Sequence, residues 1–131
     1  MGAQRAVIML DTSVLIAAPR FSADELYGAS MIAMAELHFG IQSARTTAIR
    51  SQRLQKLAHY RAALEWIGFD ERAAESYGIL AAEVSKTRSG HARSKDIMMA
   101  AQAHSLGVPF MTRNPKDFDL VKHLVEIREV D

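Results

Sequence analysis

Residues 6–18 read AVIMLDTSVLIAA, and this stretch decides the fold. Its first five residues form an unbroken apolar run, which is typical of a strand that is buried on both faces of a parallel sheet. The run stops at Asp11, and Thr12 and Ser13 lead into a short helical segment that Pro19 closes. In open parallel sheets, ligands bind at the carboxyl ends of the strands. Asp11 is therefore expected at the edge of the sheet where a site would form.

The rest of the chain alternates short strand patterns with helical patterns. Further strands are expected at residues 27–29, 64–69, 108–112 and 125–128, the last of them at an edge of the sheet, and helices at residues 31–41, 46–62, 71–87 and 96–105. Residues 89–93 are expected to form a polar turn. This alternation predicts an α/β layer structure with a largely parallel sheet.

Polar residues and a glycine mark the expected ends of the helices. Ser30, Asp70 and Ser94 are predicted N-caps, because their side-chain oxygens can accept hydrogen bonds from the first free backbone N–H groups. Gly107 is predicted to end the last helix in a left-handed conformation.

The helix at residues 46–62 is predicted to be amphipathic. Its expected core-facing residues are Ile49, Leu54, Leu57 and Ala58.

Length and composition limit the classes of protein to consider. The 131 residues, 49% of them hydrophobic and 24% charged, are expected to form one globular domain over residues 1–131. Cysteine is absent, which excludes disulfides, thiolate metal sites and a cysteine nucleophile. The sequence shows neither a membrane span nor a secretory pattern, so we expect a cytoplasmic protein without a membrane partner.

Positive charge is unevenly distributed although the net charge is only +1. No acidic residue lies between Glu36 and Glu65, or between Glu83 and Asp96. The cations within these two segments are Arg45, Arg50, Arg53, Lys56 and Arg61 in the first, and Lys86, Arg88, Arg93 and Lys95 in the second. Such segments form either solvated helix faces or surfaces that bind phosphate, for which arginine is well suited.

Three acidic residues stand in apolar surroundings. Asp11 ends the first strand, Glu36 lies within an apolar helix, and Asp96 opens another apolar segment. Each has an ordinary structural explanation: Asp11 as a helix cap, Glu36 in a salt bridge to an arginine, and Asp96 as an acid that complements a helix dipole. Burying a carboxylate in such surroundings costs several kcal/mol unless the carboxylate is paired or binds a cation.

Together, the three carboxylates would suit a divalent cation. At about 4 Å and an effective dielectric constant of about 20, two of them repel by about 4 kcal/mol, which a cation would remove. Ligation by carboxylates alone favours a hard ion, Mg²⁺ or Mn²⁺. Such ions activate water and neutralise charge in the cleavage of phosphodiesters.

Four segments in order resemble the motifs of PIN-domain ribonucleases. They are LDTSVLIA at residues 10–17, AELHFG at 35–40, DIMMAA at 96–101 and GVPFMTRNPKDF at 107–118. In a chain of this size, the set is most similar to the VapC-type toxins of bacterial type II toxin–antitoxin (VapBC) systems.

This resemblance implies a fold, an activity and a set of site residues. The fold would be a single PIN domain, an α/β/α sandwich of three layers with a central, mainly parallel sheet. The activity would be Mg²⁺- or Mn²⁺-dependent endonucleolytic cleavage of RNA, such as tRNA or rRNA. Asp11, Glu36 and Asp96 match the catalytic and metal-binding carboxylates. Thr12, Ser13 and Thr112 match hydroxyl positions that orient the acids or the water and substrate bound there.

The candidates for the path of the RNA are Arg45, Arg50, Arg53, Arg88, Arg93, Lys95 and Arg113.

The sequence departs from the family pattern at two places. Asn114 stands where many relatives carry a fourth acid, and it could ligate through its amide oxygen but brings no charge. Asp117 could replace the missing charge as a metal ligand, or it could be an N-cap of the following turn. The spacing from Asp11 to Glu36 is also short for the family, so the helical arm that often contacts the antitoxin or the RNA is expected to be trimmed.

The resemblance also implies partners. These would be a VapB-type antitoxin, whose C-terminal tail lies along the toxin's groove and often places an arginine against the acids, and a second copy of the chain in a homodimer. Operator DNA would be bound through the antitoxin complex. Two other functions stay open: a PIN-fold module that binds RNA or protein without efficient cleavage, and a PIN nuclease of RNA processing outside a toxin–antitoxin pair.

Overall fold

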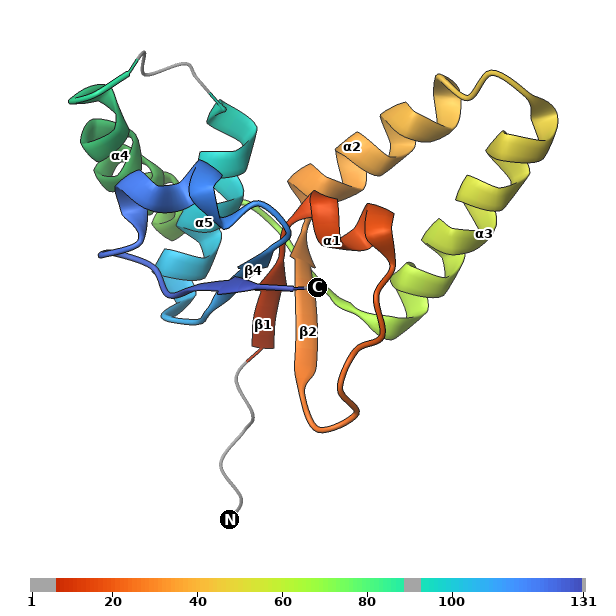
Figure 1. Ribbon diagram of the computed structural model, residues 1–131, viewed down its shortest axis with the longest axis horizontal. Coiled ribbons are helices and arrows are strands. Elements are labelled where there is room, and N and C mark those ends of the chain that lie inside the picture. The colour runs from red at the N-terminus through yellow and green to blue at the C-terminus, as the bar shows by residue number, and fades with distance from the viewer. Residues whose placement is uncertain (1–6, 89–92, 131) are drawn as a thin grey trace.

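A five-stranded parallel sheet forms the centre of the computed structural model, which describes residues 7–88 and 93–130 (Figure 1). The strands are β1 (Val7–Leu10), β2 (Leu26–Ser30), β3 (Glu65–Ile67), β4 (Phe110–Thr112) and β5 (Ile127–Glu129). Their order in the sheet is β3-β2-β1-β4-β5, so β5 is an edge strand as predicted. The turn expected at residues 89–93 lies, except for Arg93, outside the described residues.

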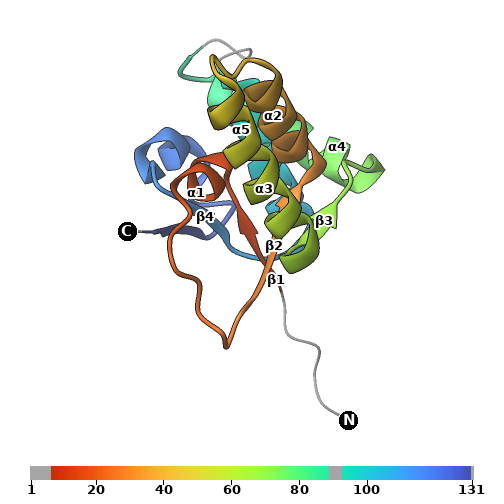
Figure 2. The same ribbon diagram turned by 90° about the vertical axis from the view of Figure 1, so that its right-hand side faces the viewer.

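Helices cover both faces of the sheet (Figures 1 and 2). The helices are α1 (Thr12–Ala17), α2 (Met31–Gln42), α3 (Thr47–Ala63), α4 (Glu71–Ser85), α5 (Ser94–Leu106) and the 3₁₀ helix η1 (Pro115–Val121). Figure 1 shows α1, α2 and α3 on one side of the sheet and α4, α5 and η1 on the other. The predicted α/β/α arrangement with a parallel sheet is confirmed.

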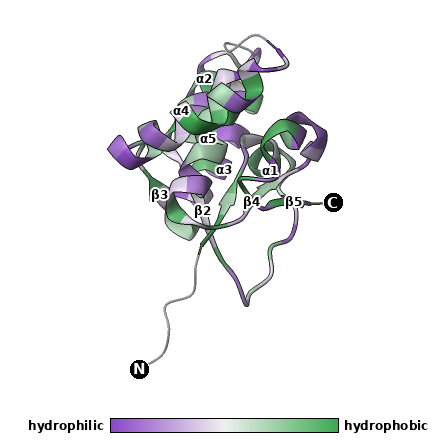
Figure 3. Ribbon diagram, turned by 90° about the vertical axis from the view of Figure 1, so that its left-hand side faces the viewer, coloured by the Kyte–Doolittle hydropathy of each residue, from purple (hydrophilic) through white to green (hydrophobic). Residues whose placement is uncertain are grey.

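The first strand is the centre of the core. β1 pairs with β2 on one side and with β4 on the other, and Met9 and Leu10 are fully buried. Burial on both faces explains why this strand is apolar at consecutive positions rather than at alternate ones. Figure 3 shows that the helices, in contrast, carry both hydrophobic and hydrophilic residues. Among the described residues, no helix is both long and apolar enough to span a bilayer.

Two of the three predicted N-caps are confirmed. The Ser30 Oγ accepts a hydrogen bond from the Ile32 backbone N–H at 2.9 Å, and the Asp70 Oδ1 accepts one from Ala73 at 2.9 Å. Ser94 is not the cap of α5, because the helix begins at Ser94 itself and Arg93 holds the N-cap position. Gly107 ends α5 with φ 67°, a left-handed conformation that glycine adopts without steric cost.

The buried face of α3 differs from the predicted one. Leu57 is buried, but Leu54 is 49% exposed and Ala58 is exposed, whereas Tyr60 is buried. The Tyr60 hydroxyl donates a hydrogen bond to the Leu15 carbonyl at 2.8 Å. Because α3 packs mainly against α2, it buries a narrow stripe rather than a broad face.

The short spacing between Asp11 and Glu36 does not trim the helical arm. This part of the chain holds α1, the connection to β2, and β2 itself, while α2 and α3 come afterwards. α2 and α3 contact each other, and Figure 1 shows both of them extending on the same side of the sheet. The spacing between Asp11 and Glu36 therefore does not set the lengths of α2 and α3, and a trimmed arm does not follow from it.

Candidate active site at the carboxyl edge of the sheet

Asp11 lies where two neighbouring strands end. It follows β1 directly, and its backbone N–H donates to the Met111 carbonyl of β4 at 2.9 Å. Asp11 is only 5% exposed to solvent. The parallel pairing of Leu10 with Met111 brings Asp11 next to Thr112, which is the last residue of β4 and is fully buried.

Two hydroxyl groups hold the Asp11 carboxylate. Thr112 Oγ1 donates to Asp11 Oδ2 at 2.8 Å, and Ser13 Oγ donates to the same oxygen at 2.9 Å. Asp11 is the residue before α1, but its side chain makes no capping hydrogen bond. The capping explanation therefore fails for this side chain. Both hydroxyls use Oδ2, so the other oxygen, Oδ1, lies outside these two hydrogen bonds.

Glu36 is also held by a hydroxyl group. It lies on α2, half-buried, and its Oε1 accepts a hydrogen bond from Thr12 Oγ1 at 2.7 Å. Among the residues that the structure describes, no ion pair joins Glu36 to an arginine, so the salt-bridge explanation fails. Thr12 and Ser13 are adjacent in sequence and orient two different acids, as the resemblance implies for these hydroxyls.

Asp96 connects the acidic residues electrostatically. Its side chain lies in the first turn of α5 and is 31% exposed. Burial is the main cause that raises its pKa from 3.8 to about 6, and the charges of Asp11, Glu36 and Asp117 raise it further. The Arg93 guanidinium acts in the opposite direction. Asp11 after β1, Glu36 on α2 and Asp117 on η1 thus lie near enough to Asp96 on α5 for their charges to act on it.

Asp117 is the fourth acid near this group. Its Oδ2 lies 2.7 Å from Arg93 Nη1, and it lies within the first turn of η1 rather than at the N-cap, so the N-cap explanation is wrong. The N-cap position belongs to Asn114, whose side chain makes no capping hydrogen bond. The backbone N–H of Asn114 donates to Thr112 Oγ1 at 3.0 Å. Asp117 is thus ion-paired with Arg93, whereas the backbone of Asn114 contacts the Thr112 hydroxyl.

The chemistry of these side chains fits a hard divalent cation. The site offers carboxylate oxygens and hydroxyls, which are the ligands that Mg²⁺ and Mn²⁺ prefer. Within residues 7–88 and 93–130, however, no three histidine or acidic side chains are grouped closely enough to hold a metal ion between them. A cation here would therefore take part of its coordination shell from water, as Mg²⁺ usually does.

The predicted cationic residues have different positions. Arg93 is ion-paired with Asp117, Lys95 and Glu36 both line a groove described below, and Arg113 is exposed while its backbone N–H donates to Ser13 Oγ at 3.3 Å. Arg45, Arg50 and Arg88 are exposed.

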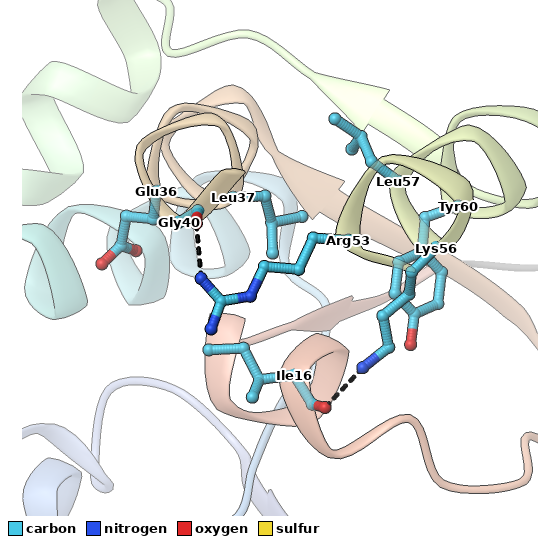
Figure 4. A pocket seen from close by; sticks show the side chains of 8 residues that line it. All are labelled: Ile16, Glu36, Leu37, Gly40, Arg53, Lys56, Leu57 and Tyr60. Carbon is cyan, nitrogen blue, oxygen red and sulfur yellow. Dashed lines mark hydrogen bonds between the residues drawn. The ribbon is translucent and has the colours of Figure 1, made fainter. Parts of the chain in front are cut away.

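A pocket of about 220 Å³ lies between α1, α2 and α3 (Figure 4). Arg53 donates to the Gly40 carbonyl at 2.5 Å, and Lys56 donates to the Ile16 carbonyl at 2.6 Å. Figure 4 shows these two cations bonding to different helices. Arg53 therefore connects α3 to α2. The sequence analysis named Arg53 only as a candidate for the RNA path and did not predict this structural role.

A larger, open groove of about 730 Å³ leads to Glu36 and Thr12. Three large exposed apolar side chains line it: Phe39, which is 73% exposed, Ile16 and Met31. Sequence reasoning did not single out Phe39, although it follows Glu36 by three residues and a helix places such residues on the same face. The groove thus combines an apolar wall with access to an acid of the site.

Solved structures with the same fold identify the class of protein. A member of the VapBC family of toxin–antitoxin systems, VapBC-5 from Mycobacterium tuberculosis, is 28% identical, with a TM-score of 0.75 over 95% of this chain and 98% of that one. The chain has the fold of a VapC-type PIN domain. No protein-family model matches the sequence, and no curated protein matches it either.

Two further VapBC structures share this VapC-type fold. VapBC2 from Rickettsia felis, bound to a DNA fragment from its promoter, is 22% identical, with a TM-score of 0.78 over 96% of this chain and 100% of that one. VapBC-1 from nontypeable Haemophilus influenzae is 21% identical, with a TM-score of 0.74 over 96% and 98%. The predicted family resemblance is thus supported by structures that match this chain over nearly its whole length.

Proposed function

We propose that this chain is a metal-dependent endoribonuclease toxin of the VapC type, which cleaves phosphodiester bonds of cellular RNA such as tRNA or rRNA. The observation that carries the proposal is the group of acidic side chains at the carboxyl edge of the sheet, where burial, and after it the charges of Asp11, Glu36 and Asp117, raise the pKa of Asp96. The similarity to VapBC toxin–antitoxin proteins supports it.

In this proposal, Asp11, Glu36 and Asp96 hold Mg²⁺ or Mn²⁺ together with water. When bound, such a cation neutralises charge on the scissile phosphate and lowers the pKa of the attacking water. The protein's part is positioning: Ser13 and Thr112 fix the Asp11 carboxylate, and Thr12 fixes that of Glu36. These short hydrogen bonds reduce the reorganisation that the acids would need on binding.

Cation-rich surfaces beside the site suit the phosphates of a long substrate. Lys95 lines the groove that reaches Glu36, and Arg113 is exposed next to Thr112. Contacts of this kind bind the RNA backbone without reading its sequence, and they weaken as the salt concentration rises.

The proposal is tested by incubating the purified protein with total cellular RNA in Mn²⁺ or Mg²⁺, and then with EDTA. Asp11→Asn and Asp96→Asn are expected to abolish cleavage, because each removes a metal-binding charge. The matched control is Asp119→Asn, which removes an exposed carboxylate of η1 that pairs with Lys122. Discrete fragments that need both the metal and Asp96 would support the nuclease.

Cleavage at the wild-type rate by either site variant would refute the site assignment. A folded, metal-loaded wild-type protein that binds RNA but does not cut it would favour the binding module, with the neutral Asn114 as the suspected cause.

The partner that we propose is a VapB-type antitoxin, which would dock in the groove lined by Ile16, Met31 and Phe39. These apolar side chains suit an amphipathic segment, and the acids at the end of the groove suit a cationic side chain. The similar structures include VapBC complexes, one of them bound to promoter DNA. We further propose that the chain forms a homodimer and contacts operator DNA only through the antitoxin.

A further inference from the structure

Arg93 bridges two acids that lie on different elements. Its Nη1 atom is 2.7 Å from Asp117 Oδ2 on η1 and 3.9 Å from Asp96 Oδ2 on α5. The Arg93 side chain is about half exposed, whereas those of Asp96 and Asp117 are more buried. One guanidinium group therefore reaches both carboxylates from the start of α5.

The backbone of Arg93 has an unfavourable conformation. Its φ is 56° and its ψ is 37°, in the left-handed region, which glycine and asparagine adopt far more readily than arginine. Arg93 is the N-cap residue of α5, and this turn directs the chain into the helix that carries Asp96. The same residue makes the two contacts with carboxylates.

The charge of Arg93 acts on the same group of acids as a bound cation would. The Arg93 Nη1 atom approaches the carboxylates of both Asp96 and Asp117, so its positive charge lies between two acids of this group. A guanidinium group stays protonated at all pH values at which the protein is folded, so this positive charge is permanent.

We propose that the Arg93 guanidinium takes the place of a second divalent cation between Asp96 and Asp117, so that the site binds a single Mg²⁺ or Mn²⁺ on the side of Asp11 and Glu36. This inference rests on the proposed metal-dependent function. The physical reason is that a divalent ion between Asp96 and Asp117 would be repelled by a fixed positive charge that already lies between these two carboxylates. Asp117 acts here as a positioning residue, which draws the guanidinium away from Asp96.

The test counts bound Mn²⁺ per chain by room-temperature electron paramagnetic resonance, which detects the free ion, and by calorimetry. The wild type is expected to bind one Mn²⁺. Arg93→Gly removes the charge and relaxes the left-handed backbone, and it is expected to bind a second, weaker ion. Arg93→Asn removes the same charge with another residue that tolerates this backbone, which protects the test against a folding defect in one variant. Lys116→Gln, which removes a positive charge one residue from Asp117, is the control and is expected to bind one.

A second variant tests the role of Asp117. In Asp117→Asn, the guanidinium has only Asp96 left to contact, so Mn²⁺ has to compete with it. The dissociation constant of the single ion is expected to rise about two- to fivefold, the range typical of a part-exposed ion pair. The Arg93→Gly/Asp117→Asn double variant is expected to bind one ion with at least wild-type affinity.

The outcomes separate this inference from the proposed function. Two Mn²⁺ ions in the wild type, or one in both Arg93 variants, would overturn the inference and leave the proposed nuclease intact. Mn²⁺ binding by neither the wild type nor the Arg93 variants would overturn the metal-dependent function and the inference together. If Lys116→Gln also binds a second Mn²⁺ ion, the net charge of the chain rather than the Arg93 contact sets the number of ions bound per chain. That result would overturn the inference.

Discussion

Replacing Asp96 by asparagine is expected to stabilise the metal-free protein at alkaline pH. In the folded chain, burial and the charges of Asp11, Glu36 and Asp117 raise the pKa of Asp96 to about 6, against an ordinary value of 3.8. Between these two values the folded state holds a proton that the unfolded state releases, so stability falls as pH rises from about 4 to about 6. Above that window the wild type bears the full cost of the buried negative charge, and Asp96→Asn does not.

The size of this effect follows from the two pKa values. At about 1.4 kcal/mol per pH unit, their difference corresponds to at most about 3 kcal/mol. The Asp96 side chain is 31% exposed, and solvent screening reduces this figure. The variant also loses a favourable acid in the first turn of a helix, which is worth about 0.3–1 kcal/mol. The net gain expected for Asp96→Asn at pH 8 is therefore about 1–2 kcal/mol, or several degrees in Tm.

The assay is thermal or urea unfolding in EDTA at pH 4 and pH 8 with constant ionic strength. The two proteins are expected to have nearly equal stability at pH 4, and the variant to be more stable at pH 8. Adding Mn²⁺ at pH 8 should then stabilise the wild type by about 2.7 kcal/mol at one hundred times its Kd, and the variant by less. Asp119→Asn, which removes an exposed carboxylate outside the cluster, is the control. A wild type as stable as Asp96→Asn at pH 8 in EDTA would refute the electrostatic argument.

Two further predictions concern the support of Asp11 and the groove. Thr112→Val removes a buried hydroxyl that donates to Asp11, so we expect a loss of about 1–3 kcal/mol in the free energy of unfolding and weaker Mn²⁺ binding. Thr112→Ser keeps the hydroxyl and should retain both the stability and the Mn²⁺ affinity. Urea unfolding and calorimetry measure these quantities, and an unchanged Thr112→Val would contradict the role of the hydroxyl. Phe39→Ser should leave Tm nearly unchanged because Phe39 is 73% exposed, but it should weaken binding of the proposed antitoxin about tenfold or more. Binding as tight as that of the wild type would place the antitoxin elsewhere, and a proposed antitoxin that neither binds nor inhibits would favour RNA processing outside a toxin–antitoxin pair.

Much of the fold could be predicted from local patterns. The apolar run before Asp11 predicted a doubly buried strand, and β1 lies between β2 and β4. Ser30, Asp70 and Gly107 act at helix ends as predicted, because their effect depends on nearby backbone groups. The prediction that Ser94 caps α5 was wrong because Arg93, in a left-handed conformation, holds the N-cap position. The helix therefore begins one residue earlier than Ser94 as N-cap would give.

The sequence by itself singled out three acids as candidates for cation binding and predicted the elements near which they lie, which are β1, α2 and α5. Asp11, Glu36 and Asp96 were identifiable because each carboxylate stands in an apolar segment, where an unpaired charge is costly. Only the tertiary structure decided how these acids are held and balanced. Thr112 and Asp11 are 101 residues apart, and they meet because β4 pairs with β1 in one register. Arg93 and Asp117 likewise form an ion pair across two elements. Periodicity and capping preferences act over a few residues, whereas these contacts depend on the packing of distant segments, so the sequence could identify the acids but not their partners.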